Sequence, residues 1–582
     1  MAMKTFLKYF LTFIIGAIAG LAGLVIIALI ILASADFSKE KPEIPSNGIL
    51  RIQLPIDLEE KGNNESINRI FSSFSGNTPL ALNEFRAILK QAADDSRILG
   101  ISIDAGMFGG GLAKAQEIRA CIDSFQKSGK PVWCYSENYS EQGFFIASAC
   151  DRIFANPKGV GEFNGFSSGI VMYKGMLEKL GIDVQVFKVG KFKGAVEPYT
   201  QEQLSDDNRK QIQEYLGSLF QNQLNQIAQD RKINLDSLKS FALNGNSYLL
   251  ENCLQAGLID ELAYYDEYET SLKTKYKDFK WVDSKNYKNG DEEYEYIEEK
   301  IAVVYLEGEI IPGKSESEGQ IASDDVCKLL RKIREDEDVK ALVLRVNSPG
   351  GSSVASDLIA REVSLIKKTK PVIASFSNVA ASGGYYISCL ADSIFADRNS
   401  ITGSIGVFAL IPNTAQLYNK TLGLRYESVS TGTNAELWRP DKPLNESQQR
   451  IMQQMIDGVY EDFTSIVAKG RGMSISRVKE IAEGRVYSGV QAKEIGLIDG
   501  FGGLEYSIKA AAQKANLKKY RINEYPKDKD PFEQLISAIE MKANSKINLS
   551  NNPIGEALIK NARQWENLEG IQMRLPWSTD YR

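Results

Sequence analysis

The chain of 582 residues contains no histidine at all. This absence excludes a Ser-His-Asp triad, a Cys-His dyad and any metal site that depends on imidazole ligands. Cysteine is also scarce: there are six, and no two form a CxxC pair, so a zinc site is not expected. The sequence has no Walker A motif either. We therefore expect neither a metal nor another cofactor.

The chain also carries no excess of positive charge. The net charge is −6 and the isoelectric point is near 5.4, so nucleic acid is not an expected partner. Cys134, Cys150 and Cys389 lie in apolar runs and are expected to be buried free thiols. One disulfide remains open if the compartment is oxidising. The length favours two to four domains.

Charge is also absent from Tyr9 to Ala35, a run of 27 residues that is long enough to cross a bilayer. Lys4 and Lys8 precede the run and Asp36 follows it, which predicts a cytoplasmic N-terminus with the bulk of the chain on the other side. We expect residues 1–36 to form a transmembrane anchor. A cleaved signal peptide is the alternative, because residues 33–35 read "ASA", but the apolar run is longer than an ordinary signal peptide core.

Beyond this segment the chain repeats itself at an offset near 240 residues. "GKPVWCYSENYSEQGFFIASACDRIFANP" begins at residue 129 and "TKPVIASFSNVAASGGYYISCLADSIFADR" at residue 369. "LLENCLQAGLIDEL" in the first copy matches "SGVQAKEIGLIDGF" in the second. We expect two domains, 45–275 and 301–517, an acidic linker at 276–300 and a tail at 518–582 that has no repeat partner.

Each copy alternates apolar strands with amphipathic helices. In the first, "GILRIQLPI", "LNEFRAILKQAADD" and "ILGISIDA" follow one another; the second has "IAVVYLEGEI", "SDDVCKLLRKIREDED" and "VKALVLRVN". This alternation predicts parallel βαβ units, so the fold class is α/β with two tandem domains.

The two copies differ where chemistry is expected. Ser382, in "VAASGGYYIS", aligns with Glu141, while Lys193, in "GKFKGAVEPY", aligns with Ala435. A serine without histidine needs another base, and a lysine can serve if burial keeps it neutral. One copy therefore supplies a serine and the other a lysine, which predicts a single composite site. Spacing alone leaves Lys188 and Lys191 open, and Lys193 as an ordinary solvated side chain remains the plain alternative.

Both copies also place glycines directly after a buried strand. The second reads "NSPGGSS" from Asn347 to Ser353, and the first reads "AGMFGGG". Glycine turns can aim backbone N–H groups at a ligand, as an oxyanion hole requires. A turn with no further role is the alternative, but ligands do bind at the carboxyl ends of strands in α/β sheets.

Taken together, "NSPGG", "VAASGGYYIS", "ITGSIGV" and "GKFKGAVEPY", in two copies behind an apolar N-terminus, resemble the signal peptide peptidase A (protease IV) family in its two-copy form. The resemblance implies a Ser/Lys protease with a crotonase-like and Clp-protease-like fold. It implies that Ser382 is the nucleophile, Lys193 the general base and Ser404 the residue that orients the lysine. The N–H groups of Gly351 and Gly383 match the family's oxyanion hole.

The same resemblance implies partners and a location. The expected substrates are hydrophobic peptides, above all signal peptides left in the membrane. The expected assembly is a homotetramer in the bacterial inner membrane, with one span per chain and the catalytic domains on the periplasmic side. A crotonase-type acyl-CoA enzyme and an inactive membrane scaffold are the two alternatives from other function classes.

Overall fold

A computed structural model describes residues 16, 20, 44–62, 80–287, 297–315, 319–437, 439–527 and 571–575. The chain divides into two compact units, residues 1–45 and 46–582, and strands β1 to β20 all belong to the second unit. The expected anchor at residues 1–36 lies outside the described residues, apart from Gly16 and Gly20. Within the part that is described, no helix combines the length and apolarity needed to cross a membrane.

The first repeat forms a parallel sheet of six strands in the order β6-β4-β3-β2-β1-β7. Its strands are β1 (Gly48–Gln53), β2 (Ile98–Asp104), β3 (Val132–Ser136), β4 (Arg152–Ala155), β6 (Glu261–Leu262) and β7 (Lys280–Asp283).

The second repeat builds the same sheet again, in the order β18-β14-β13-β11-β8-β19, and adds β15 and β17 beyond β13. Its strands are β8 (Lys300–Glu307), β11 (Val339–Ser348), β13 (Val372–Ala381), β14 (Ser393–Ala396), β15 (Ile401–Gly403), β17 (Val486–Ser488), β18 (Gly500–Phe501) and β19 (Arg521–Tyr525). The matched strand order shows that the sequence repeat is a structural repeat.

Each repeat ends on a short edge strand outside the boundaries that we expected. Strand β7 lies within the 276–300 segment, and β19 lies within the 518–582 tail. Both pair in parallel with the first strand of their own repeat, β1 and β8. Polar and aromatic residues dominate these segments, so their apolar signal is weaker than that of the central strands.

A third sheet joins the two repeats in the order β10-β9-β12-β20-β16-β5. Its strands are β5 (Asp183–Val189), β9 (Glu309–Ile311), β10 (Gln320–Ala322), β12 (Gly350–Ser352), β16 (Val407–Asn413) and β20 (Gln572–Arg574). Strand β5 comes from the first repeat and pairs antiparallel with β16 of the second over seven residues. This pairing carries a first-repeat segment onto the second repeat.

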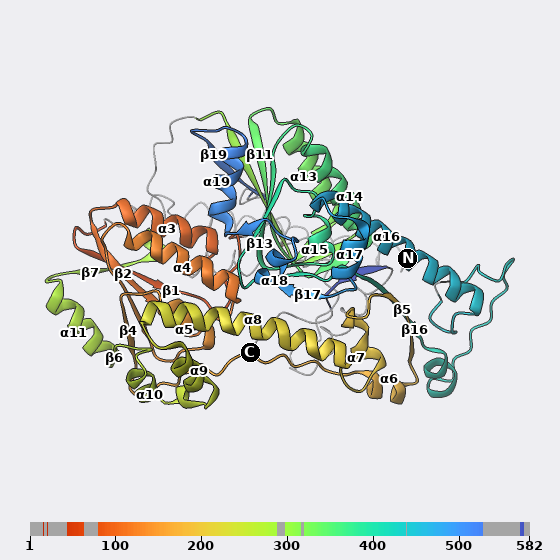
Figure 1. Cartoon of the computed structure of the whole chain (residues 1–582), viewed down its shortest axis with the longest axis horizontal. Coiled ribbons are helices and arrows are strands. Elements are labelled where there is room, and N and C mark those ends of the chain that lie inside the picture. Colours follow the sequence, from red (N-terminus) through yellow and green to blue (C-terminus); the bar gives the residue numbers. More distant parts are fainter. Residues whose placement is uncertain are drawn as a thin grey trace, which may run out of the picture. The chain divides into compact units, whose positions relative to one another are not determined.

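Helices cover these sheets (Figure 1). Those of the first repeat are α3 (Leu82–Asp94), α4 (Leu112–Gln126), α5 (Glu141–Ala147), α6 (Lys174–Leu180), α7 (Glu197–Thr200), α8 (Asp206–Arg231), α9 (Leu235–Leu243), α10 (Leu250–Gln255), α11 (Tyr265–Lys275) and α12 (Ser284–Tyr287). Those of the second are α13 (Ser323–Glu335), α14 (Ser353–Ile366), α15 (Gly383–Tyr386), α16 (Glu446–Arg471), α17 (Ile475–Ile481), α18 (Gly489–Glu494) and α19 (Leu504–Lys514).

The longest helices begin and end where the local sequence directs. Ser205 caps α8 and Asn445 caps α16, each accepting a hydrogen bond from the backbone three residues on. Helix α16 stops at Gly472, which adopts the left-handed conformation that glycine tolerates best. In Figure 1, α8 (yellow) extends from the first repeat toward β17, and its Ser218 hydroxyl lies 2.8 Å from that of Ser488.

The cores are apolar, with one buried ionic cluster between the repeats. Arg345, on β11, is 1% exposed; its Nε lies 2.9 Å from Glu60 Oε2 and its Nη2 2.5 Å from Glu117 Oε1. Both carboxylates belong to the first repeat. Burial raises the pKa of Glu60, but the positive charges of Arg345 and Lys114 outweigh it and leave that pKa below its usual value.

We predict that Arg345→Met lowers the free energy of unfolding by about 3–5 kcal/mol, because it removes the guanidinium that bonds the buried Glu60 and leaves Glu117 paired with Arg86 alone. Denaturant unfolding measures the loss. Arg331→Met is the matched control, since Arg331 is more than half exposed and Arg334 also pairs with its partner Glu362; its effect on stability is expected to be much smaller. Equal losses in the two variants would contradict a role for Arg345 in joining the repeats.

Candidate active site

Ser382 occupies a sharp turn between β13 and α15. Its φ of 55° and ψ of −115° lie where residues other than glycine are strained, and such strain gathers at functional sites. Its N–H donates to the Gly403 carbonyl at 2.8 Å, which fixes the turn against β15. Neighbouring positions must be small: a Cβ on Gly383 would meet Ser356 Oγ at 2.7 Å, and one on Gly384 would meet the Ser348 carbonyl at 2.7 Å.

Lys193 follows β5 in a loop that is held against the second repeat. The Phe192 N–H donates to the Glu483 carbonyl at 2.9 Å. Gly190, with φ of 106°, runs so close to Glu483 that an added Cβ would come within 2.4 Å of its backbone. A Cβ on Gly484 would likewise come within 2.7 Å of Lys193. Backbone contact between the repeats therefore places the lysine.

The two repeats meet at the Lys193 amine. Its Nζ lies 2.8 Å from Ser382 Oγ, 2.9 Å from the Ser404 carbonyl oxygen and 2.9 Å from Ser404 Oγ. All three side chains are 0% exposed. Burial among these uncharged partners lowers the pKa of Lys193 well below its usual 10.5, which favours the neutral amine.

The other two candidate lysines have different surroundings. Lys191 is exposed, and its ammonium lies 4.8 Å from the centre of the Phe192 ring. Lys188 is half-buried on β5, where it is in register with Phe408 of β16. Of the three lysines that spacing left open, Lys193 is the one hydrogen-bonded to Ser382.

Two glycine amides lie beside Ser382. An ideal Cβ on Gly383 would be 3.2 Å from the Gly351 nitrogen, so these two N–H groups are neighbours. Gly350 has φ of 103° and Gly351 has φ of 154°, and a Cβ on Gly351 would come within 2.0 Å of the Ile310 carbonyl oxygen. A side chain at either position would disturb the turn, which explains the "PGG" sequence.

Glu141 occupies the matching position of the first repeat, in the first turn of α5. Its Oε2 accepts hydrogen bonds from the N–H groups of Asn164 at 2.7 Å and Gly165 at 3.2 Å. Its buried Oε1 has no hydrogen-bond partner in the part of the chain that the structure covers. Burial raises the pKa of Glu141 to about 7. This position holds a buried carboxyl group and no nucleophile.

Sequence reasoning missed the residues that hold the lysine loop from α8. Gln211, 1% exposed, donates from Nε2 to the Phe192 carbonyl at 2.9 Å and accepts the Val486 N–H on Oε1 at 3.1 Å. Asn208, 0% exposed, accepts a further Gln211 hydrogen bond at 2.6 Å. The sequence pattern that could have identified them is a pair of side-chain amides, Asn208 and Gln211, on the same face of α8 as Ile212 and Tyr215.

The site has the composition of an acyl-transfer centre. Among the described residues, no group of three cysteine, aspartate or glutamate side chains is placed to bind a metal ion. The site instead holds a strained serine, a buried lysine with lowered pKa and two adjacent amides. These are the parts of nucleophilic catalysis with an oxyanion hole.

Comparison with known proteins agrees with this class. The model of "Peptidase family S49" matches residues 124–278 and 364–518, together more than half of the chain. "Protease 4" of Haemophilus influenzae is 34% identical over 85% of this chain and 84% of its own. "Serine protease SPPA, chloroplastic" of Arabidopsis thaliana is 33% identical over 80% of this chain and 70% of its own. "Putative signal peptide peptidase SppA" of Enterococcus faecium is 40% identical over 35% of this chain and 59% of its own.

The chain belongs to peptidase family S49. It is a serine peptidase with two tandem copies of the family domain, and the resemblance drawn from its motifs is confirmed.

We predict that Glu141→Gln changes how stability depends on pH. The folded-state pKa of about 7 lies above the unfolded value of 4.5, so the folded chain binds more protons between them and loses stability as pH rises through this window. Glutamine does not titrate and can still accept both N–H groups. The melting temperature of the variant relative to wild type should rise from about pH 5 to about pH 8.

The exposed Glu202 supplies the control. Glu202→Gln should shift the melting temperature little. A constant difference for Glu141→Gln across the range would mean that Glu141 does not titrate near pH 7.

Proposed function

We propose that the chain is a membrane-anchored serine endopeptidase that uses a Ser382/Lys193 dyad to degrade hydrophobic peptides, including cleaved signal peptides. One observation carries the proposal: the buried amine of Lys193, from the first repeat, lies 2.8 Å from the hydroxyl of Ser382, from the second. The sequence contains no histidine, so a lysine takes the role of the general base.

The three contacts of Lys193 fit a neutral amine. A neutral amine has two N–H donors and one lone pair. Two donations go to Ser404, at its carbonyl and its hydroxyl oxygen, each at 2.9 Å. The lone pair then faces Ser382 and accepts the hydroxyl proton. Ser404 is thus a positioning residue that aims the lone pair.

Catalysis follows in two steps. Lys193 takes the proton as Ser382 Oγ attacks the scissile carbonyl, and the N–H groups of Gly351 and Gly383 stabilise the oxyanion. The lysine returns the proton to the leaving amine, which leaves an acyl group on Ser382. Lys193 next takes a proton from water, the hydroxide attacks the ester, and the returning proton restores Ser382 as the peptide acid departs.

The substrate class rests on the relatives and on the sequence. The Enterococcus faecium relative carries the name of a signal peptide peptidase. An uncharged N-terminal run of 27 residues suits an anchor, with the catalytic domains on the periplasmic side of a bacterial inner membrane.

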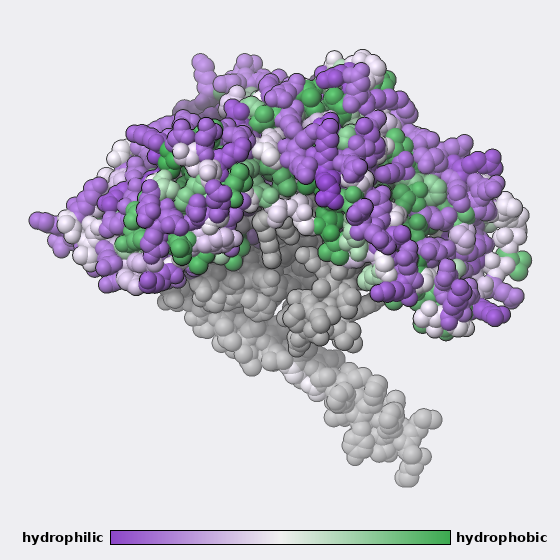
Figure 2. Space-filling view, turned by 60° about the horizontal axis from the view of Figure 1, so that its bottom comes forward, coloured by the Kyte–Doolittle hydropathy of each residue, from purple (hydrophilic) through white to green (hydrophobic). Residues whose placement is uncertain are grey.

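Contact with other copies in a homotetramer is supported by a group of apolar side chains that are each more than half exposed: Leu422, Leu424, Tyr426 and Val429. Elsewhere, hydrophobic residues appear as patches among hydrophilic ones (Figure 2).

We predict that Ser382→Ala abolishes hydrolysis of a fluorogenic apolar peptide, and that Lys193→Met lowers kcat about 10²–10⁴-fold. Methionine fills the buried space of the lysine stem without a basic nitrogen, so the fold should persist. Lys191→Met, two residues away and exposed, is the matched control and should keep wild-type activity. Full activity in Lys193→Met, with none in Ser382→Ala, would assign the base to another group.

We also predict the pH dependence of kcat/KM. The base works only when Lys193 is neutral, so activity is lost as pH falls through its pKa and gained as pH rises through it. Because burial lowers that pKa well below 10.5, the ascending limb should lie well below 10.5. A pH–rate profile on a peptide without titrating groups measures it. A limb centred near 10.5 would contradict a buried lysine base.

A further inference from the structure

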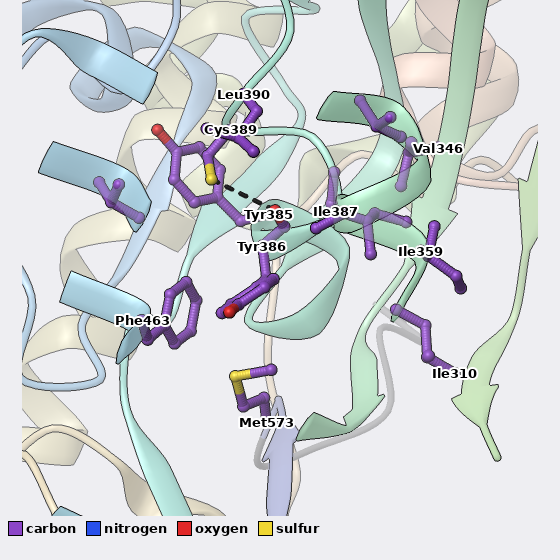
Figure 3. Packing of buried hydrophobic residues seen from close by; sticks show 14 of the residues in the cluster. Ile310, Val346, Ile359, Tyr385, Tyr386, Ile387, Cys389, Leu390, Phe463 and Met573 are labelled. Carbon is purple, nitrogen blue, oxygen red and sulfur yellow. Dashed lines mark hydrogen bonds between the residues drawn. The ribbon is translucent and has the colours of Figure 1, made fainter. Parts of the chain in front are cut away.

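The two sides of the candidate site are held in the fold by different kinds of contact. On the serine side, α15 packs into an apolar cluster of the second repeat, and Figure 3 shows its Tyr386 beside Phe463, with ring centres 5.0 Å apart. On the lysine side, Ala195 and Val196 pack against β16, and the loop also meets α8 through hydrogen bonds. The lysine side therefore contains polar contacts that can be removed one at a time.

The side-chain amide of Gln211 joins the lysine loop to the strand that holds Ser404. Its Nε2 donates to the carbonyl of Phe192, the residue before the lysine, at 2.9 Å, and its Oε1 accepts the Val486 N–H at 3.1 Å. The neighbouring Arg485 carbonyl accepts the Ser404 N–H at 2.6 Å. One buried side chain thus connects the backbone that carries the amine to the backbone that holds both oxygens which the amine contacts.

The same strand also leads to Ser382. Val486, in β17, is in register with Gly403 of β15. The Gly403 carbonyl accepts the Ser382 N–H at 2.8 Å. A shift of the lysine loop relative to β17 would therefore change the distance between Lys193 and both of its serine partners.

A buried carboxyl group holds this glutamine in turn. Gln211 Nε2 also donates to Asn208 Oδ1 at 2.6 Å, and Asn208 Nδ2 donates to Glu197 Oε2 at 3.1 Å. Glu197 accepts two more hydrogen bonds, from the N–H of Ser205 at 3.0 Å and from its hydroxyl at 2.6 Å. Glu197 is 1% exposed and Asn208 is 0% exposed.

The carboxyl group sets the direction of both amides. A carboxylate only accepts hydrogen bonds, so Asn208 turns its NH2 toward Glu197 and its oxygen toward Gln211. Gln211 then donates to that oxygen and to the lysine loop, which leaves its own oxygen for the Val486 N–H. Either amide in the flipped orientation would bring two donors or two acceptors together.

The second repeat, which has no lysine at the matching position, also lacks the carboxyl group and the glutamine. The alignment that places the lysine opposite Ala435 also places Glu197 opposite Arg439. Helices α8 and α16 both have 26 residues, and aligned from their first residues they match Gln211 with Ile451. The lysine, the carboxyl group and the glutamine therefore occur together in one copy.

We propose that Gln211 and Glu197 are positioning residues for the lysine base. Gln211 holds the Lys193 loop at a fixed distance from Ser404, and Glu197, through Asn208, fixes the orientation in which Gln211 does so. With this network in place, the amine donates to both oxygens of Ser404 and its lone pair faces the serine hydroxyl. This inference rests on the proposed function, because the network acts only through the lysine base.

Gln211→Met should lower kcat for a fluorogenic apolar peptide about 10²-fold, because a displacement of about 1 Å can cost a factor of this size. KM should change less than about twofold, since the variant displaces the base and leaves substrate binding intact. Methionine fills a similar volume but makes neither hydrogen bond. Gln213→Met is the matched control, because Gln213 is exposed on the same helix, and it should keep the wild-type kcat. An unchanged kcat in Gln211→Met would overturn the proposal.

The pH–rate profile separates positioning from a general loss of folded protein. A loss of folded molecules lowers kcat/KM by the same factor at every pH. A lysine released from Ser404 gains water, which favours the ammonium, so the ascending limb of Gln211→Met should move up by about half a pH unit or more. Neighbouring charges, Glu197 on α7 and the ion pair of Arg485 with Glu214, are the same in both chains. A lower kcat with an unmoved limb would leave Gln211 a structural role and overturn the proposal.

A second variant tests the outer part of the network and does not depend on the folding of the first. Glu197→Gln keeps the volume but turns an NH2 group toward donors, so Asn208 loses its fixed orientation. It should lower kcat about tenfold with KM unchanged. The double variant Glu197→Gln, Gln211→Met should be no slower than Gln211→Met alone, because both changes act through one chain of hydrogen bonds. Losses that multiply would overturn the link between the two residues.

Failure of this inference is distinguishable from failure of the proposed function. If the wild-type chain and both single variants hydrolyse the peptide with equal kcat and equal pH profiles, the dyad stands and the positioning network is overturned. If the wild-type chain hydrolyses no peptide and a serine-reactive phosphonate does not label Ser382, the proposed function itself fails.

Discussion

The arrangement of the whole site depends on one hydrogen bond, between the Lys193 amine and the Ser382 hydroxyl, at 2.8 Å and 0% exposure. A charged ammonium in that position would lose its hydration without gaining a counter-charge, so burial favours the neutral form. The neutral amine is itself a polar group that must be satisfied, and Ser404 satisfies it twice. The site therefore needs a dry environment and fixed acceptors at once. Both come from contact between the two repeats, because the amine and its three oxygen partners belong to different copies.

That contact combines backbone pairing and buried polar groups with apolar packing, in which Ala195 and Val196 lie against Phe408 and Leu410. Strand β5 carries the chain to the lysine by pairing with β16, and the loop after β5 is held to Glu483 and, through Gln211, to Val486. Elsewhere in the second repeat, Arg345 joins β11 to carboxylates of the first repeat. Hydrogen bonds and ion pairs of this kind are directional, so they fix one relative placement of the repeats more narrowly than apolar packing would. A hydrogen bond between Lys193 of one repeat and Ser382 of the other requires such a fixed placement.

Much of the fold and of the candidate site could be predicted from the sequence, because the two copies of the repeat can be compared with each other. Aligning the copies identified the central strands and drew attention to Ser382 and Lys193 at the positions where the copies disagree. Contacts without a local signature could not be found in this way. Arg345 reads as one basic residue in an apolar strand, and its carboxylate partners are more than 200 residues distant along the chain. The edge strands β7 and β19 are short and polar, and β20 has three residues and no counterpart in the first repeat. Residue preferences for β-strand carry little information over such short segments, so these three strands are recognised only from their pairing in the folded chain.

The third sheet connects the two sides of the candidate site. Strands β9, β10 and β12 form one side of it, and β16 with β5 forms the other; β20 connects them. The first side carries the glycine amides, and the second leads directly to Lys193. Strand β20 pairs with β12 on one edge and with β16 on the other, so a single strand connects the side that carries the amides to the side that leads to the lysine. The two halves of the candidate site therefore keep their spacing through main-chain hydrogen bonds, which are directional.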